Sequence, residues 1–156
     1  MKRIAICAPS TPFAEEDAAR VLALAAEFPG LELHFHPQCF AVEGHFAGPD
    51  DLRCAALVEC ANDSSFDAVW FARGGYGAVR VAEGALAQFS HAAQDKQFLG
   101  YSDAGTLLGG LYRARIGHPV HAPMPGDIRR AGGEDAVRRT LGYLAGDRAG
   151  LEPSLD

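Results

Sequence analysis

Short apolar runs alternate along the chain with longer segments that carry apolar residues at helical spacing. The runs typical of strands are 3–8, 31–36, 67–72, 97–101 and 118–122. The helical segments are 14–28, 49–62, 77–89, 103–115 and 133–146. Because a helical segment follows each strand-like run, the pattern predicts an α/β fold with a parallel sheet of about five strands and helices on both faces.

A doubly wound sheet of this flavodoxin-like kind binds ligands at the carboxyl ends of its strands. The carboxyl ends of the predicted strands and the segments that follow them hold Ser10, residues 73–77, Ser102 and His121. Parallel strands joined by right-handed crossovers bring such loops to one edge of the sheet. This edge is therefore where the sequence predicts a functional site.

Composition narrows the class of protein. The chain has 156 residues and a formal net charge of −6, and no basic run occurs, so nucleic acid is not expected as a partner. The first apolar stretch, 4–8, is shorter than the roughly 7–15 residues of a secretory signal. No stretch approaches the roughly 20 apolar residues of a membrane helix. The sequence predicts a cytoplasmic protein without a membrane partner, with one domain over 1–146 and the start of a linker at 147–156.

The residues that bind metals are scattered. The cysteines contain no CxxC pair, and buried reduced thiols are predicted at all of them: Cys7, Cys39, Cys54 and Cys60. No metal site is predicted, because zinc requires a tighter group of ligands. Among the histidines, His121 is the one expected near the carboxyl edge of the sheet, where contact with a substrate is one interpretation and an ordinary structural role is the other.

The segment ARGGYG follows the third predicted strand. Its glycines, Gly74, Gly75 and Gly77, allow positive φ and a close backbone approach to a ligand. Free N–H groups at such a turn, next to a helix N-terminus, favour an anion. Plain turn geometry is the alternative interpretation, although the neighbouring Arg73 favours a carboxylate partner.

The segment GYSDAG joins the fourth predicted strand to its helix and places Ser102 at the corner. Two interpretations are open. Serine commonly caps a helix, and serine is also the nucleophile on the strained strand-to-helix turn of many hydrolases. Small neighbours at Gly100, Ala104 and Gly105 fit the crowded second case. The N–H groups of Asp103 and Gly75 would then form a two-donor oxyanion hole.

Three motifs in this order, ARGGYGAVR, FLGYSDAGTLL and VHAPM, resemble the L,D-carboxypeptidases of peptidoglycan recycling and the microcin-immunity serine peptidases. The resemblance covers about residues 4–146 and implies hydrolysis of an amide between an L-centre and a terminal D-amino acid, with murein tetrapeptide as substrate. By motif, Ser102 is the nucleophile, and Asp103 and Gly75 are the backbone oxyanion donors. Arg73, Gly74 and Tyr76 of the first motif are expected to shape the substrate site, together with His121.

Two local departures from the family pattern occur, at 104–106 and at Ala122, where the family has Ile-Thr after Ser-Asp and a glycine respectively. Family members are also about twice as long, and their catalytic glutamate and histidine lie in a C-terminal domain. The resemblance therefore implies that these 156 residues alone are inactive. It implies no cofactor, a small peptide substrate and a homodimer. The alternatives are a peptidase that detoxifies a peptide–nucleotide, and a non-catalytic, anion-binding module.

Overall fold

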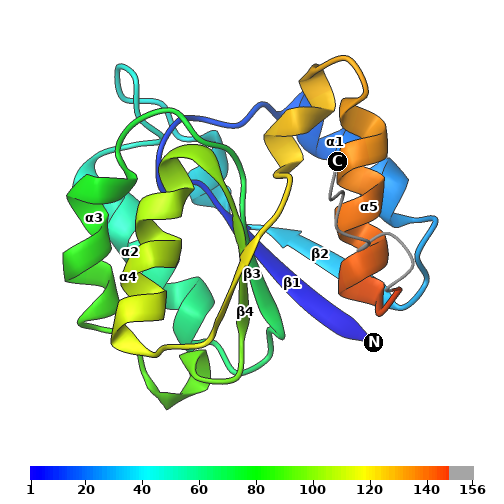
Figure 1. Cartoon of the computed structure of the whole chain (residues 1–156). Helices are drawn as coiled ribbons and strands as arrows, with labels where there is room; N and C mark the ends of the chain where they lie inside the picture. The colour runs from blue at the N-terminus through cyan, green and yellow to red at the C-terminus, as the bar shows by residue number, and fades with distance from the viewer. Residues whose placement is uncertain (148–156) are drawn as a thin grey trace, which may run out of the picture.

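The computed structural model describes residues 1–147, and these residues form one parallel sheet flanked by helices (Figure 1). The strands are β1 (Lys2–Cys7), β2 (Leu31–Phe35), β3 (Ala68–Phe71), β4 (Gln97–Gly100) and β5 (His118–His121). All are parallel, in the order β2-β1-β3-β4-β5. This topology confirms the predicted α/β, flavodoxin-like fold.

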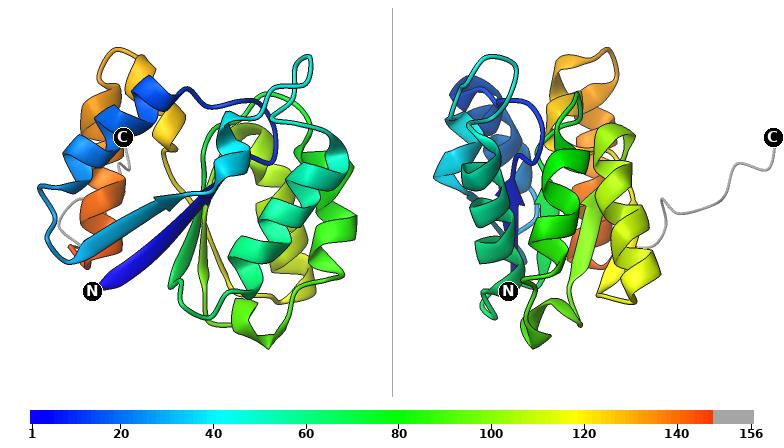
Figure 2. Two further views of the ribbon diagram at one scale, coloured as in Figure 1. Left: turned by 180° about the vertical axis from the view of Figure 1, so that it is seen from behind. Right: turned by 90° about the vertical axis from the view of Figure 1, so that its left-hand side faces the viewer.

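The five α-helices of residues 1–147 divide between the two faces of the sheet. They are α1 (Glu15–Ala25), α2 (Asp50–Asn62), α3 (Ala78–Leu86), α4 (Gly105–Ala114) and α5 (Gly133–Ala145). Figure 2 shows α1 and α5 on one face, and α2, α3 and α4 on the other. Every helix is somewhat shorter than predicted, because periodicity marks the centre of a helix better than its ends.

Each face of the sheet covers its own hydrophobic core. Along β3, Ala68 and Trp70 join the core beneath α1 and α5, whereas Val69 and Phe71 join the core beneath α2, α3 and α4. A strand buried on both faces has no polar positions, and this explains the continuous apolar run at 68–72. Full burial of a large apolar side chain such as Trp70 contributes about 1.5–3 kcal/mol.

The strand register brings the predicted loops together. In the sheet, Val69 lies opposite Phe98, and Gly100 lies opposite His121. The loops that follow β3 and β4 therefore leave the same edge from adjacent strands, as the sequence predicts. Among residues 1–147, no helix is long and apolar enough to cross a membrane. Apart from Asp147, the predicted linker at 147–156 lies outside the described residues.

Candidate active site

Ser102 occupies a strained corner between β4 and α4. Its φ is +58°, a left-handed conformation that costs a residue with a side chain about 1–2 kcal/mol. It opens a 3-10 turn, η3 (Ser102–Ala104), and no side-chain hydrogen bond caps either this turn or α4. The Ser102 carbonyl accepts the Gly105 N–H, but its side chain caps nothing, so the structure contradicts the interpretation of Ser102 as a side-chain helix cap.

The corner is crowded on one side. A Cβ on Gly100 would lie 2.9 Å from Phe71 Cδ2 and 3.2 Å from the Cβ of Ala104, so a larger residue at 100 would collide with its neighbours. Gly105 was expected to be small for the same reason, but a Cβ at this position would meet no atom within 4 Å. That part of the prediction is wrong, because Gly105 already belongs to the first turn of α4 and a Cβ there meets open space.

The glycine-rich loop after β3 lies directly against Ser102. A Cβ on Gly74 would lie 3.0 Å from Ser102 Oγ and 3.5 Å from the Asp103 nitrogen. Gly75 has a φ of +111°, and a Cβ there would overlap the side chain of Thr11. The Thr11 hydroxyl also donates to the Gly74 carbonyl at 2.6 Å. Glycine is thus required at 75, by backbone conformation and close contact, whereas a side chain at 74 would press on Ser102.

Two N–H groups in the loops at Ser102, those of Gly75 and Asp103, have no hydrogen-bond acceptor among residues 1–147. They belong to the two loops that the Gly74–Ser102 contact holds together. Unused backbone donors of this kind are what stabilise an oxyanion in acyl transfer.

The carboxylate of Asp103 fixes the corner from behind. Asp103 Oδ2 accepts the Ala78 N–H at 3.0 Å and the Ser10 hydroxyl at 2.6 Å, and Ser10 is completely buried. Ala78 is the first residue of α3, so an internal carboxylate already occupies the helix N-terminus predicted to attract an anion. This finding speaks against an external anion at that position.

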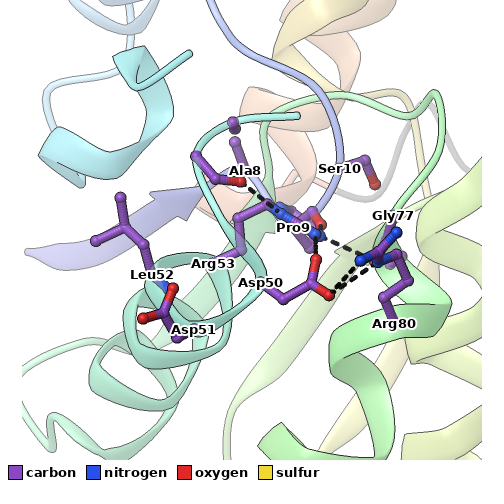
Figure 3. A network of polar contacts seen from close by, with 12 residues as sticks. Ala8, Pro9, Ser10, Asp50, Asp51, Leu52, Arg53, Gly77 and Arg80 are labelled. Atoms are coloured by element: carbon purple, nitrogen blue, oxygen red, sulfur yellow. Dashed lines mark hydrogen bonds and ion pairs between the residues drawn. The ribbon is translucent and has the colours of Figure 1, made fainter. Parts of the chain in front are cut away.

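A buried arginine holds the surrounding loops. Arg53 of α2 is fully buried and donates to the carbonyls of Pro9 at 2.6 Å, Gly77 at 2.9 Å and Gly48 at 3.1 Å. Figure 3 shows Arg53 together with Pro9, Gly77 and Asp50, whose carboxylate pairs with its guanidinium. One side chain therefore connects the loop after β1, the loop before α2 and the last glycine of ARGGYG.

Ser102 lines a small cavity of about 190 Å³ at the carboxyl edge of the sheet. The glycine loop 73–75, Tyr101 and Ser102 form one side of it. The other side comes from the segment that follows β5 and its 3-10 turn η4 (Pro125–Arg129), with Met124, Gly126, Asp127, Arg129 and Arg130 lining the cavity.

Polar contacts fix this second side. Tyr101 donates from its hydroxyl to Asp127 Oδ1 at 2.6 Å, and Arg130 Nη1 donates to the Tyr101 oxygen at 3.0 Å. Burial, together with the Asp127 carboxylate, raises the pKa of the Tyr101 phenol, so this group remains a donor at neutral pH. The sequence reasoning missed Asp127, Arg129 and Arg130. The available signal was the polar run DIRR close behind the fifth strand.

Three predicted residues do not line the cavity: Asp103, Tyr76 and His121. His121 does not line it but faces a neighbouring groove of about 450 Å³ beside α5, and its ring lies 5.8 Å from that of Tyr101. Tyr76 is 73% exposed and packs against His45. Arg73, Gly74 and Gly75 do line the cavity. Within residues 1–147, no histidine or carboxylate forms a hydrogen bond with Ser102 Oγ.

Known proteins place the chain in a family. A family profile described as LD-carboxypeptidase N-terminal domain matches residues 4–122. A putative carboxypeptidase of Streptomyces coelicolor is 34% identical over 148 residues, which are 89% of this chain and 46% of that protein. The murein tetrapeptide carboxypeptidase of Pseudomonas aeruginosa is 28% identical over 122 residues, which are 78% of this chain and 39% of that protein. The chain belongs to the LD-carboxypeptidase family of peptidases and spans less than half the length of these two relatives.

Solved structures share the fold. An MccF-like protein of Bacillus anthracis matches 92% of this chain and 44% of its own, with a TM-score of 0.72 and 20% identity. The muramoyltetrapeptide carboxypeptidase of Oxalobacter formigenes matches 80% of this chain and 40% of its own, with a TM-score of 0.64 and 23% identity. At these identities the likeness supports the architecture, and the chemistry must be argued from this chain's own residues.

Proposed function

We propose that this chain is the nucleophile-bearing domain, residues 1–146, of a cytoplasmic serine peptidase. The peptidase hydrolyses an L,D amide bond and releases the terminal D-amino acid of a murein tetrapeptide. The observation that carries the proposal is the left-handed, uncapped Ser102, which lies against a glycine loop beside two unused N–H groups. Membership of the LD-carboxypeptidase family and the Pseudomonas aeruginosa relative support this reaction and substrate.

In the proposed reaction, Ser102 Oγ attacks the carbonyl carbon on the L side of the scissile amide, and its proton passes to a general base. The Gly75 and Asp103 N–H groups stabilise the oxyanion. The tetrahedral intermediate then collapses, the C–N bond breaks, and the amine of the D-residue leaves with a proton. Water hydrolyses the acyl-enzyme and regenerates Ser102.

The general base is proposed to come from outside the 156 residues, where the family resemblance places a glutamate and a histidine. Within residues 1–147, the Asp103 carboxylate is bonded to Ser10 and Ala78, and His121 lies outside the cavity. A serine without an adjacent base is a weak nucleophile. The 156-residue chain alone is therefore expected to be inactive. Assembly into a homodimer stays a prediction.

The proposal is tested by the release of D-alanine from a murein tetrapeptide. The protein in its full encoded length is expected to turn over, and Ser102→Ala to lower the rate by about 10⁴–10⁶-fold, as loss of a triad serine does elsewhere. Ser90→Ala is the matched control, because Ser90 caps a surface 3-10 turn through its own hydroxyl. Full activity of Ser102→Ala would refute the proposal. Turnover of a peptide–nucleotide in place of the tetrapeptide would support Ser102 as the nucleophile and refute the murein tetrapeptide as the substrate.

A further inference from the structure

Three arginines, Arg73, Arg129 and Arg130, line the cavity beside Ser102. Arg129 is ion-paired with Asp17, and the Arg130 Nε lies 3.5 Å from Asp127 Oδ1. Asp17 is also paired with Arg20, so two carboxylates face four guanidinium groups, which leaves positive charge in excess around the cavity. Such a site favours an anionic ligand.

Arg73 is the cation without a carboxylate partner among residues 1–147. Its Nη1 has a long contact of 3.3 Å with the Pro12 carbonyl. Gly126 packs against its stem, since a Cβ on Gly126 would lie 2.7 Å from Arg73 Cβ. Arg73 is therefore placed on the cavity wall with its charge uncompensated.

Two polar contacts orient the Arg130 side chain. Its Nη1 donates to the Tyr101 hydroxyl at 3.0 Å and its Nε faces Asp127. Asp127 is itself fixed, because its Oδ2 accepts the Met124 N–H at 2.8 Å and its Oδ1 accepts the Tyr101 hydroxyl at 2.6 Å. The Nη2 of Arg130 has no partner among residues 1–147, and the side chain is 71% exposed. A ligand can therefore reach a guanidinium that is already oriented, which reduces the entropy lost on binding.

The size and place of the cavity indicate which anion it takes. Its volume of about 190 Å³ is below the ~300–1,000 Å³ of pockets for drug-sized ligands, so it suits one small residue. Tyr101 directly precedes Ser102 in the chain, so the group that orients Arg130 is joined to the proposed nucleophile. A guanidinium recognises a carboxylate through two parallel hydrogen bonds.

We infer that Arg130, oriented by Tyr101 and Asp127, binds the terminal carboxylate of the substrate, with Arg73 as the second cation of this subsite. The inference rests on the proposed function, because the carboxylate belongs to the residue that the proposed reaction releases. Such a subsite selects peptides that end one residue beyond the scissile bond, and it rejects chains that continue.

The test is a nuclear magnetic resonance titration of the 156-residue chain with N-acetyl-D-alanine and, separately, with N-acetyl-D-alaninamide. The two probes differ in the charge of one group. The carboxylate is expected to shift the amide signals of Tyr101, Ser102 and Arg130 and to bind at least about tenfold more tightly than the amide, as loss of a charge-assisted hydrogen bond predicts.

Arg130→Ala is expected to remove this preference, and Arg130→Lys to restore it in part, because lysine keeps the charge without the fork. Arg113→Ala is the matched control, since Arg113 is exposed near the end of α4, and it should bind as the unchanged chain does. Equal affinity for the two probes, no shift with either, or a preference that survives Arg130→Ala would overturn the inference.

The titration needs no turnover, so it separates this inference from the proposed function. A carboxylate preference that depends on Arg130 stands even if Ser102 is never acylated. Conversely, release of D-alanine by a protein whose Arg130→Ala variant keeps the carboxylate preference would refute the subsite and leave the peptidase in place.

Discussion

Two residues other than glycine have positive φ among residues 1–147, and they lie at opposite ends of the same helix. Ser102 has a φ of +58° at the approach to α4, and Arg115 has a φ of +56° directly after it. Arg115 is an ordinary left-handed helix end, because its N–H and that of Ile116 bond to the last carbonyls of α4. At Ser102 the carbonyl accepts the Gly105 N–H, but the side chain caps neither η3 nor α4.

The two ends of α4 differ in what the left-handed backbone conformation achieves. At Arg115 the left-handed conformation satisfies carbonyls that the helix leaves unpaired. At Ser102 it instead sets the side chain against the Gly74 loop and leaves the Asp103 N–H unused. Strain that persists without local compensation requires surroundings that impose it. Here these are Gly100, the Asp103 carboxylate network and Arg53.

The largest expected effect comes from removing the arginine that holds the loops near Ser102. Arg53→Met leaves the carbonyls of Pro9, Gly48 and Gly77 without their buried donor. We expect the free energy of unfolding in urea to fall by about 3–5 kcal/mol. Arg113→Met, on the exposed surface of α4, should change it by less than about 0.5 kcal/mol. Equal stability of the two variants would show that the region around Ser102 needs no such support.

A smaller loss of stability is expected from a substitution in the glycine-rich loop after β3. Gly75→Ala introduces a Cβ that overlaps Thr11 at a φ of +111°, and it should cost about 1–3 kcal/mol. Gly132→Ala is the matched control, because Gly132 has a φ of +72° but open space around its Cβ position. The urea midpoints of both variants measure the difference. If Gly132→Ala lowers the free energy of unfolding as much as Gly75→Ala does, the overlap with Thr11 does not contribute to the loss of stability.

The smallest expected change in stability comes from replacing the two left-handed residues, Ser102 and Arg115, by glycine. Ser102→Gly and Arg115→Gly both remove the strain of a side chain at positive φ, which is about 1–2 kcal/mol. The greater entropy of glycine in the unfolded chain partly offsets this gain in stability. We expect the free energy of unfolding of each variant, measured by thermal unfolding, to rise by up to about 1 kcal/mol. Release of D-alanine should be lost in Ser102→Gly and kept in Arg115→Gly. Loss of activity in both would mean that strain alone, rather than the serine hydroxyl, matters.

The sequence predicted the order of strands and helices and the edge of the sheet at which the candidate site lies. Periodicity predicted the five strand–helix units, and the adjacency of the loops at 73–77 and Ser102 followed from consecutive strands that pair in the sheet. Contacts between distant side chains were not predictable. Asp103 reaches Ala78 across 25 positions, and Tyr101 reaches Asp127 across 26. Such pairings depend on the packed fold, and no local pattern encodes them.

The central claim is that Ser102 is a nucleophile held by a strained turn. The most direct measurement is the intact mass of the protein, in its full encoded length, after incubation with a fluorophosphonate that reacts with activated serines. We predict a single adduct located at Ser102, no adduct in Ser102→Ala, and an adduct like that of the unchanged protein in Ser90→Ala. An adduct of the same extent in Ser102→Ala, or one located at another residue, would contradict the account.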